Sequence, residues 1–213
     1  MKYDSLILAI AFSLSALLTQ HPCDSKVIFK SDEHGVAYCT TKGTLFKRNA
    51  VVVGKNLDIA ARLTWSATAD QAQVEVAVPV RSFRSGSKKR DKHVAEILGA
   101  PEHARIHFRT EWLDADMLCE SVVQQNWMLP GSLELKGIRF PVDFNLQFSS
   151  ATSIPIVKGS LQTTFSTLSI EVPSVGPGGM IARPHDDLQL FVQLHLEKID
   201  GAGALHHCFS NGN

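Results

Sequence analysis

The stretch AQVEVAVPVRSFRSGSKKRDKHVAEILGAPEHARIHFRTEW, residues 72–112, decides the fold of this chain. Its first part carries apolar side chains at every second position, namely Val74, Val76, Val78 and Val80. Polar or small residues stand between them, and this period of two is typical of a β-strand with one dry face and one wet face. The stretch therefore begins with a strand whose dry face must be covered by other parts of the protein.

A charged crossover follows this strand. Residues 81–93 are too polar to bury, and Ser87 is suited to cap a helix that carries Val94 and Ile97 on one face. Residues 99–101, Gly-Ala-Pro, supply the stop signal for that helix. A second strand is then predicted where the alternation resumes, at Ile106, Phe108 and Trp112. The rest of the chain is predicted to be sheet built around this unit.

Length and charge limit the class of protein. A chain of 213 residues suits one domain and is long enough for a sizeable core. Lysine plus arginine and aspartate plus glutamate number 21 each, so no net charge attracts nucleic acid or an anionic surface. We therefore expect no nucleic-acid partner, although residues 81–92 form a local basic cluster.

An apolar segment, Leu6–Leu18, lies near the N-terminus. As a helix it would rise only about 20 Å, whereas the bilayer core is roughly 30 Å thick. The segment therefore favours a secretory signal peptide over residues 1–20, and a periplasmic or secreted protein. An uncleaved membrane anchor of similar hydrophobicity is the alternative.

Apolar alternation continues along most of the chain, over residues 57–65, 133–148, 157–165 and 188–196. The apolar positions shift parity at Leu168, which predicts a bulge. Leu113–Gln125 is ambiguous, and Gly201–Asn213 resembles a polar tail without pattern. This gives eight to ten strands and one helix. Consecutive alternating strands predict an all-β, antiparallel sheet that closes or packs on itself, and the pattern does not choose between barrel and sandwich.

Four cysteines lie beyond the predicted signal peptide, namely Cys23, Cys39, Cys119 and Cys208. In an exported chain an even number permits two disulfides, with three possible connectivities that the sequence does not decide. Because the termini of barrels often lie close together, a bond between Cys23 and Cys208 is one plausible pairing. No two cysteines have the close spacing of a zinc site.

Several motifs, in this order, resemble the central block of the YceI-like family of lipocalin-like barrels that bind polyisoprenoid lipids. They are Val78–Phe83, Arg90-Asp91-Lys92-His93, Pro101, Ile106-His107-Phe108, the hairpin at Gly131–Val142 and the closing strand at Asp187–Leu196. The resemblance covers residues 26–198 and leaves residues 199–213 as a polar C-terminal tail. It implies an antiparallel lipocalin-like β-barrel with one short helix.

The resemblance also implies a function without catalysis, namely binding of a long apolar isoprenoid-type lipid or quinone for transport or storage. The apolar residues expected to face inward and contact the ligand are Leu63, Val76, Val78, Phe108, Leu135, Phe144, Leu146, Leu190 and Val192. Because an eight-stranded closed sheet can also be filled by side chains, a solid-core structural or interaction module of the cell envelope is the alternative. A homodimer is compatible with either function.

Arg90, Asp91 and His93 open the predicted helix and have two interpretations. They could receive a polar head group, or close a lid, at the mouth of the cavity. Alternatively, Arg90 and Asp91 could pair and cap locally, since anions are favoured at a helix N-terminus.

Neither a metal site nor a catalytic centre is indicated. On a strand, His103 and His107 would lie about 13 Å apart, too far to share an ion with bonds near 2 Å. No Gly-x-Ser-x-Gly elbow and no glycine-rich phosphate loop occurs. We therefore expect no enzyme, no cofactor and no metal, unless His93, His103 and His185 converge in space.

Overall fold

The computed structural model describes residues 23, 28–44, 50–100, 102–149, 155–172, 182–205 and 208. The predicted signal peptide and Pro101 lie outside this set. Within it, no helix has both the length and the apolar character needed to cross a membrane.

All strands of the described residues belong to one twelve-stranded sheet. They are β1 (Gly35–Thr44), β2 (Ala50–Asn56), β3 (Ala60–Trp65), β4 (Gln71–Pro79), β5 (Arg105–Arg109), β6 (Leu113–Asp114), β7 (Asn126–Leu135), β8 (Ile138–Ser149), β9 (Ile156–Thr164), β10 (Ala182–Pro184), β11 (Asp187–His195) and β12 (Ile199–Asp200). The helical elements are η1 (Val80–Ser82), α2 (Lys88–Ile97), α3 (Ala115–Val123), η3 (Leu196–Lys198) and η4 (Ala202–Leu205).

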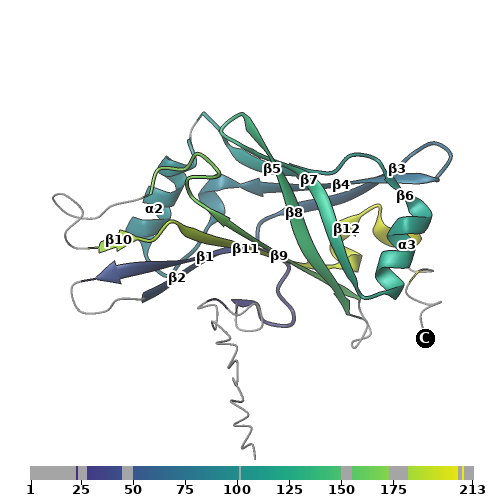
Figure 1. Cartoon of the computed structure of the whole chain (residues 1–213), viewed down its shortest axis with the longest axis horizontal. Coiled ribbons are helices and arrows are strands. Elements are labelled where there is room, and N and C mark those ends of the chain that lie inside the picture. The colour runs from purple at the N-terminus through teal and green to yellow at the C-terminus, as the bar shows by residue number, and fades with distance from the viewer. Residues whose placement is uncertain are drawn as a thin grey trace, which may run out of the picture.

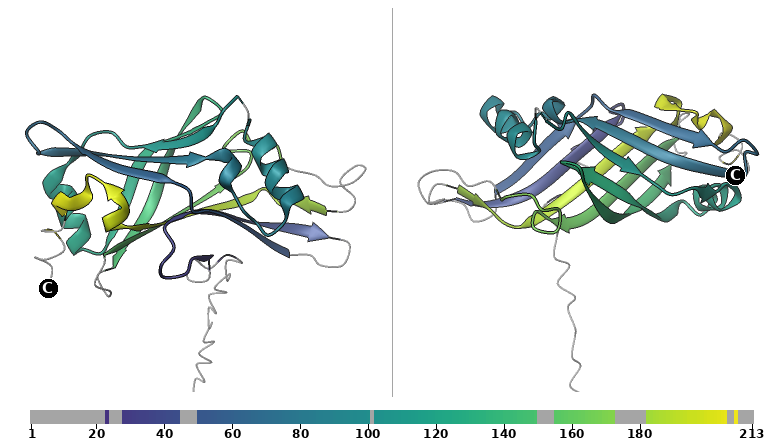
Figure 2. Two further views of the ribbon diagram at one scale, coloured as in Figure 1. Left: turned by 180° about the vertical axis from the view of Figure 1, so that it is seen from behind. Right: turned by 90° about the horizontal axis from the view of Figure 1, so that it is seen from above.

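The sheet curls into a half-barrel (Figures 1 and 2). Its strand order is β10-β1-β11-β9-β8-β7-β5-β4-β3-β12, with β2 paired to β1 and β6 to β4. Neighbouring strands are antiparallel, except that the two-residue β12 runs parallel to β3. The prediction of an all-β, antiparallel, lipocalin-like architecture is confirmed.

The stretch that decided the fold forms the elements predicted for it. β4 and β5 pair with Val76 opposite Phe108, so their apolar side chains share one face of the sheet. The Ser87 side chain caps α2 by accepting a hydrogen bond from the backbone N–H of Arg90. The helix ends at Ile97, and Gly99 follows its C-cap with a φ of 83°, which is accessible to glycine at little cost. Trp112 differs from the prediction, because it lies beyond β5 and is exposed.

The prediction of a single helix is wrong, because the described residues contain a second α-helix, α3, in the ambiguous stretch after Trp112. Asp114 caps it by accepting a hydrogen bond from the backbone N–H of Met117. Leu118 and Val122, one turn apart, are buried against the end of the half-barrel. Capping and this short apolar face together stabilise a helix that the sequence alone left undecided.

The segment expected to be a patternless polar tail is partly folded. Ala202 and Leu205 of η4 are buried and pack in the same cluster as Leu118 and Val122 of α3. A disulfide between Cys119 and Cys208 joins the two segments. The C-terminal segment therefore covers one end of the half-barrel, where Figure 1 shows it beside α3.

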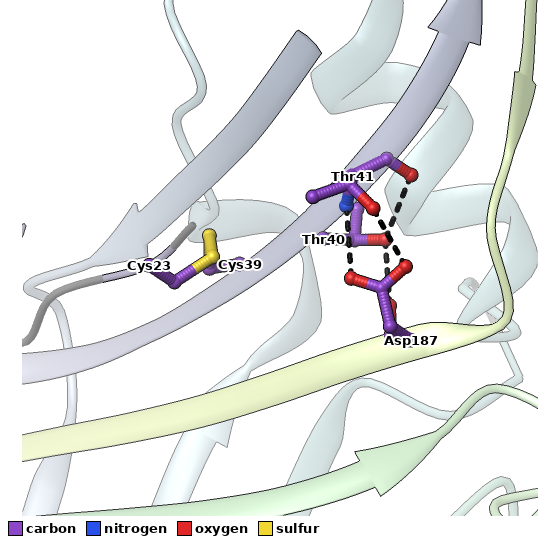
Figure 3. The surroundings of a disulfide bond; sticks show 5 residues. All are labelled: Cys23, Cys39, Thr40, Thr41 and Asp187. Atoms are coloured by element: carbon purple, nitrogen blue, oxygen red, sulfur yellow. Dashed lines mark hydrogen bonds between the residues drawn. A yellow bond between two sulfur atoms is a disulfide. The ribbon is translucent and has the colours of Figure 1, made fainter. Parts of the chain in front are cut away.

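The pairing of Cys23 with Cys208 is wrong. Cys23 bonds to Cys39 on β1 (Figure 3). Next to this disulfide, Thr41 on β1 donates its hydroxyl to Asp187 at the start of β11, at 2.7 Å. Gln193 donates to the backbone carbonyls of Lys30 and Glu33, at 2.7 and 2.8 Å. The disulfide and the Gln193 hydrogen bonds attach the residues preceding β1 to β1 and β11. The Thr41–Asp187 hydrogen bond joins β1 to β11 directly.

Candidate functional site

The concave face of the half-barrel is apolar because alternate residues of each strand point to it. The ladder registers align these side chains in rows across the sheet. Val76, Phe108 and Leu133 stand opposite one another on β4, β5 and β7. Leu146 and Val192 flank Gly159 in the same way on β8, β9 and β11. The Phe108 and Phe144 rings pack edge to face with centroids 5.3 Å apart, a favourable aromatic geometry.

These side chains enclose a cavity of about 800 Å³. Several of them, including Phe144, Leu190 and Val192, line the cavity and remain only partly buried. The interior is therefore not filled, and the alternative of a solid core is wrong for this structure. Cavities of roughly 300–1,000 Å³ with mostly apolar walls are typical of small-molecule sites.

Eleven of the twelve predicted ligand-binding residues line this cavity, namely Leu63, Val76, Val78, Phe108, Leu135, Phe144, Leu146, Leu190, Val192, Arg90 and His93. Asp91 is the exception. Its carboxylate points away to Ser85, from which it accepts hydrogen bonds of both the backbone N–H, at 2.8 Å, and the hydroxyl. The local interpretation of Asp91 therefore fits the structure better than a contact with ligand.

Arg90 fits both the local interpretation and the ligand-binding interpretation. Its Nε donates to the Ser85 hydroxyl at 2.7 Å, and a terminal nitrogen donates to the Ser85 carbonyl at 2.6 Å. The side chain thus fixes the turn before α2 while also lining the cavity. His93 lies on the exposed side of α2 near the mouth, with Nδ1 at 3.6 Å from a Glu96 carboxylate oxygen.

The polar residues at the cavity wall that the sequence analysis did not name as site residues include Tyr38, Lys42 and Lys89. Tyr38, Thr40 and Lys42 all line the cavity, as alternate residues on one face of a strand should. The period of two in β1 was the signal that could have found them. It was obscured by Gly43, because a glycine inside a strand pattern commonly marks a turn or bulge.

The hydroxyl of Tyr38 is buried, and it makes no hydrogen bond of acceptable geometry with a described residue. Burial raises the pKa of this phenol, and Asp91 adds to that rise, whereas Arg90 and Ser85 oppose it. The group is therefore a neutral hydrogen-bond donor at physiological pH. The Ser85 side chain is within reach of this hydroxyl, although the contact does not have the geometry of a good hydrogen bond.

The opposite end of the cavity is apolar. Leu118 of α3 lines it together with Leu196, Ala202 and Leu205 of the C-terminal segment. The sequence analysis did not include Ala202 and Leu205 because residues 199–213 were expected to be a tail. Among the described residues, no group of three His, Cys, Asp or Glu side chains could hold a metal ion.

This fold and this site define a class of protein, a curled antiparallel half-barrel around an apolar internal cavity. The chain belongs to the YceI-like family, because the model of the YceI-like domain matches residues 22–182. A comparison with curated proteins found no significant match.

Solved structures share the fold at low sequence identity. BcnA of Burkholderia cenocepacia is 14% identical, with a TM-score of 0.53 over 75% of this chain and 93% of BcnA. A polyisoprenoid-binding domain from Saccharophagus degradans, implicated in plant cell wall breakdown, is also 14% identical, with a TM-score of 0.50 over 75% of this chain and 93% of that domain.

Proposed function

We propose that this protein binds the apolar chain of a long isoprenoid-type lipid or quinone inside the half-barrel, without catalysis, and so transports or stores it. The observation that carries the proposal is the unfilled cavity of about 800 Å³ with its apolar wall. Membership of the YceI-like family and the fold shared with a polyisoprenoid-binding domain support the same function.

The energetics of burial favour such a ligand. Removing apolar surface from water contributes about 25 cal/mol per Å², so 400 Å² of lipid chain contributes roughly 10 kcal/mol. Association costs on the order of 4–15 kcal/mol in lost freedom of motion. A long chain can therefore bind without any strong polar contact, whereas a short one cannot.

The proposal is tested by varying the length of the prenyl chain of the ligand. We expect delipidated protein to bind one prenyl alcohol per chain. Affinity should rise with each added isoprene unit until the cavity is full, because each buried methylene contributes about 0.8 kcal/mol. The measurement is a titration by calorimetry or fluorescence with prenyl alcohols of two, four, six and eight units. Absence of saturable binding at every length, or an affinity independent of length, would contradict the proposal.

We also propose that the protein acts in the periplasm or outside the cell. Two disulfides, Cys23–Cys39 and Cys119–Cys208, are typical of an oxidising compartment. The apolar segment Leu6–Leu18 supports export. N-terminal sequencing of protein from the native host should find a mature chain that begins between Ala16 and Cys23, since Cys23 must be kept for its disulfide. An intact Met1 on cytoplasmic protein would rule the proposal out.

A further inference from the structure

The two ends of the half-barrel carry opposite charges. Residues 81–92, which include η1 and the first half of α2, contain one acid, Asp91, and six bases, namely Arg81, Arg84, Lys88, Lys89, Arg90 and Lys92. Residues 111–123, which run into α3, contain no base and four acids, namely Glu111, Asp114, Asp116 and Glu120. Figures 1 and 2 show α2 and α3 at opposite ends of the half-barrel. These segments give its ends opposite charge although the whole chain has none.

A depression of about 610 Å³ lies on the outer side of α2, outside the apolar cavity. Four exposed bases border it, and we call them the basic face: Arg81, Arg84, Lys88 and Lys92. They come from η1, the turn after it and α2. The basic face therefore combines charges from two short elements that pack together at one end of the sheet.

The acids that border this depression leave most of the basic face unbalanced. A Glu96 carboxylate oxygen lies 3.8 Å from Nζ of Lys92. The Asp91 carboxylate points instead to the Ser85 turn, where it accepts the backbone N–H at 2.8 Å. The other three bases form no ion pair with any residue in the part of the chain that the structure describes. Their charge is free to meet an anionic partner.

An exposed apolar side chain adjoins these bases. The turn between β7 and β8 lies against the end of α2, because a Cβ built on Gly99 would be 3.0 Å from the Lys136 side chain. Ile138, the first residue of β8, is 49% exposed beside this turn. Bases together with exposed apolar side chains are typical of surfaces that lie in the interface of an anionic bilayer.

The basic face is continuous with the mouth of the cavity. Lys92 and Glu96 border both the outer depression and the cavity, whereas Val94 and Ile97 of the same helix line only the cavity. One side of α2 therefore faces the interior and the other carries the bases. A bilayer in contact with the basic face lies at the mouth, so a lipid passes between the two without crossing bulk water.

We propose that the basic face docks on an anionic lipid bilayer, with α2 towards the membrane and α3 away from it, and that lipid enters or leaves the cavity there. This rests on the proposed function, since a lipid cargo must be exchanged with a membrane. Each base near an anionic surface strengthens the attachment. Because the chain has no net charge, the contact is weak enough to be reversible and depends on orientation.

The opposite orientation is disfavoured by charge. Exposed apolar side chains also occur at the α3 end, among them Trp112, Met117 and Val123. They lie in the segment that carries four acids and no base, which an anionic surface repels. An anionic bilayer therefore selects the α2 end.

Binding to vesicles tests the docking. Vesicles of phosphatidylcholine alone are compared with vesicles that also contain phosphatidylglycerol, by sedimentation of bound protein. We expect binding to the anionic vesicles to be about tenfold tighter or more at low ionic strength. The difference should shrink as salt is added, because exposed charges are screened within about 8 Å at 0.15 M.

Charge variants assign the binding to the basic face. Arg81→Gln with Lys88→Gln should weaken binding to anionic vesicles by roughly fivefold per base. It should leave affinity for prenyl alcohols in solution unchanged, since neither residue lines the cavity. The matched control, Lys158→Gln with Lys198→Gln, removes the same charge from residues outside both the cavity and the depression. Arg84 is kept because its guanidinium donates to two backbone carbonyls. Thermal unfolding checks that each variant is folded.

Tryptophan fluorescence tests the orientation. Ile138→Trp places a reporter at the α2 end, and Met117→Trp places one at an equally exposed position on α3. On anionic vesicles with brominated acyl chains, the added tryptophan should be quenched in Ile138→Trp and not in Met117→Trp. Both variants keep the three native tryptophans, so any quenching of those is common to both. Equal quenching, or quenching in Met117→Trp alone, would overturn the orientation.

The remaining outcomes separate this inference from the proposed function. Equal binding to neutral and anionic vesicles, or equal losses in the two double variants, would overturn the docking while prenyl alcohol binding in solution upholds the lipid site. Vesicle binding as expected, without prenyl alcohol binding, would overturn the proposed function and leave the docking in place. Polyglutamate that binds as tightly as anionic vesicles at equal negative charge would mean a surface for acidic polymers, and would also overturn the docking.

Discussion

The ring of Tyr38 lies across Gly54, the residue opposite it in the ladder between β1 and β2. A Cβ built on Gly54 would lie 2.3 Å from Cε1 of the Tyr38 ring, a distance that real structures do not show. The ring also packs against Phe83, with centroids 5.7 Å apart. Glycine at position 54 thus holds Tyr38 against the wall and keeps its ring out of the cavity.

Gly54→Ala should therefore destabilise the protein and move Tyr38. Overpacking of this kind typically costs about 1–3 kcal/mol in the free energy of unfolding. The matched control is Gly203→Ala, where an added Cβ would meet nothing within 4 Å. Urea unfolding measures both variants. Equal stability of the two variants would show that the ring does not depend on Gly54.

Leu146→Trp should reduce lipid binding with little loss of stability. Leu146 lines the cavity, and in an unfilled interior the larger ring has room, whereas in a solid core it would cost about 1–3 kcal/mol. Val192→Trp should behave in the same way, since Val192 lines the same part of the cavity. We expect a loss of less than about 1 kcal/mol in ligand-free protein and a large fall in prenyl alcohol affinity.

The control for these variants is Gln147→Trp, the neighbouring exposed position on β8. It places the same ring on the opposite face of the strand and should leave lipid affinity unchanged. Strong destabilisation of ligand-free protein by both inward tryptophans would mean that no usable cavity exists.

The two disulfides should differ in their contribution to stability. They join residues 16 and 89 positions apart, and chain entropy then gives about 3 kcal/mol for Cys23–Cys39 and about 4.6 kcal/mol for Cys119–Cys208. Replacing both cysteines of a pair by alanine, followed by denaturant unfolding, measures each. Four free thiols in denatured, non-reduced native protein would contradict the pairing altogether.

His34 should make stability fall as the solution is acidified. Burial, with Lys198 and His195 nearby, lowers the pKa of His34 from 6.5 to about 4. Its Nδ1 accepts a hydrogen bond from the backbone N–H of His195 at 3.1 Å, which requires a ring unprotonated at that nitrogen. The unfolded chain takes up the proton more readily than the folded one. The stabilisation is therefore complete above pH 6.5 and is lost as pH falls towards 4.

The control variant is His34→Asn, whose side chain keeps a hydrogen-bond acceptor for the His195 N–H but does not titrate. Between pH 7 and pH 4.5 the wild type should lose roughly 1–2 kcal/mol more than the variant, since solvent around the half-buried ring screens part of the effect. Unfolding curves at several pH values measure the difference. Parallel pH profiles for the two proteins would exclude His34 as the source.

The features predictable from the sequence are those set by local rules. The period of two in β4, the Ser87 cap and the Gly99 stop each depend on a few neighbouring residues, and all appear in the structure. The apolar cavity wall followed from the same alternation, because a strand that alternates must place one set of side chains inside. Leu57 is an exception to this alternation. It belongs to the predicted alternating stretch 57–65, but it precedes β3 and is exposed.

The features that were missed depend on contacts between distant parts of the chain. The pairing of Cys119 with Cys208 requires α3 and the C-terminal segment to meet at one end of the half-barrel. The bulge predicted at Leu168 is instead a turn after β9, in which Ser169 has a φ of 51°. Leu168 is buried in that turn by side chains from other parts of the chain. Its apolar character therefore reflects packing in a turn and not the alternating pattern of a strand.

The most direct test of the central claim, that the half-barrel holds an isoprenoid-type chain, is mass spectrometry of lipid extracted from protein purified from its native host without detergent. We predict close to one isoprenoid-type molecule per chain, and a much lower yield from the Leu146→Trp variant than from Gln147→Trp. No lipid above the background of an unrelated exported protein, or equal lipid in the two variants, would contradict the account.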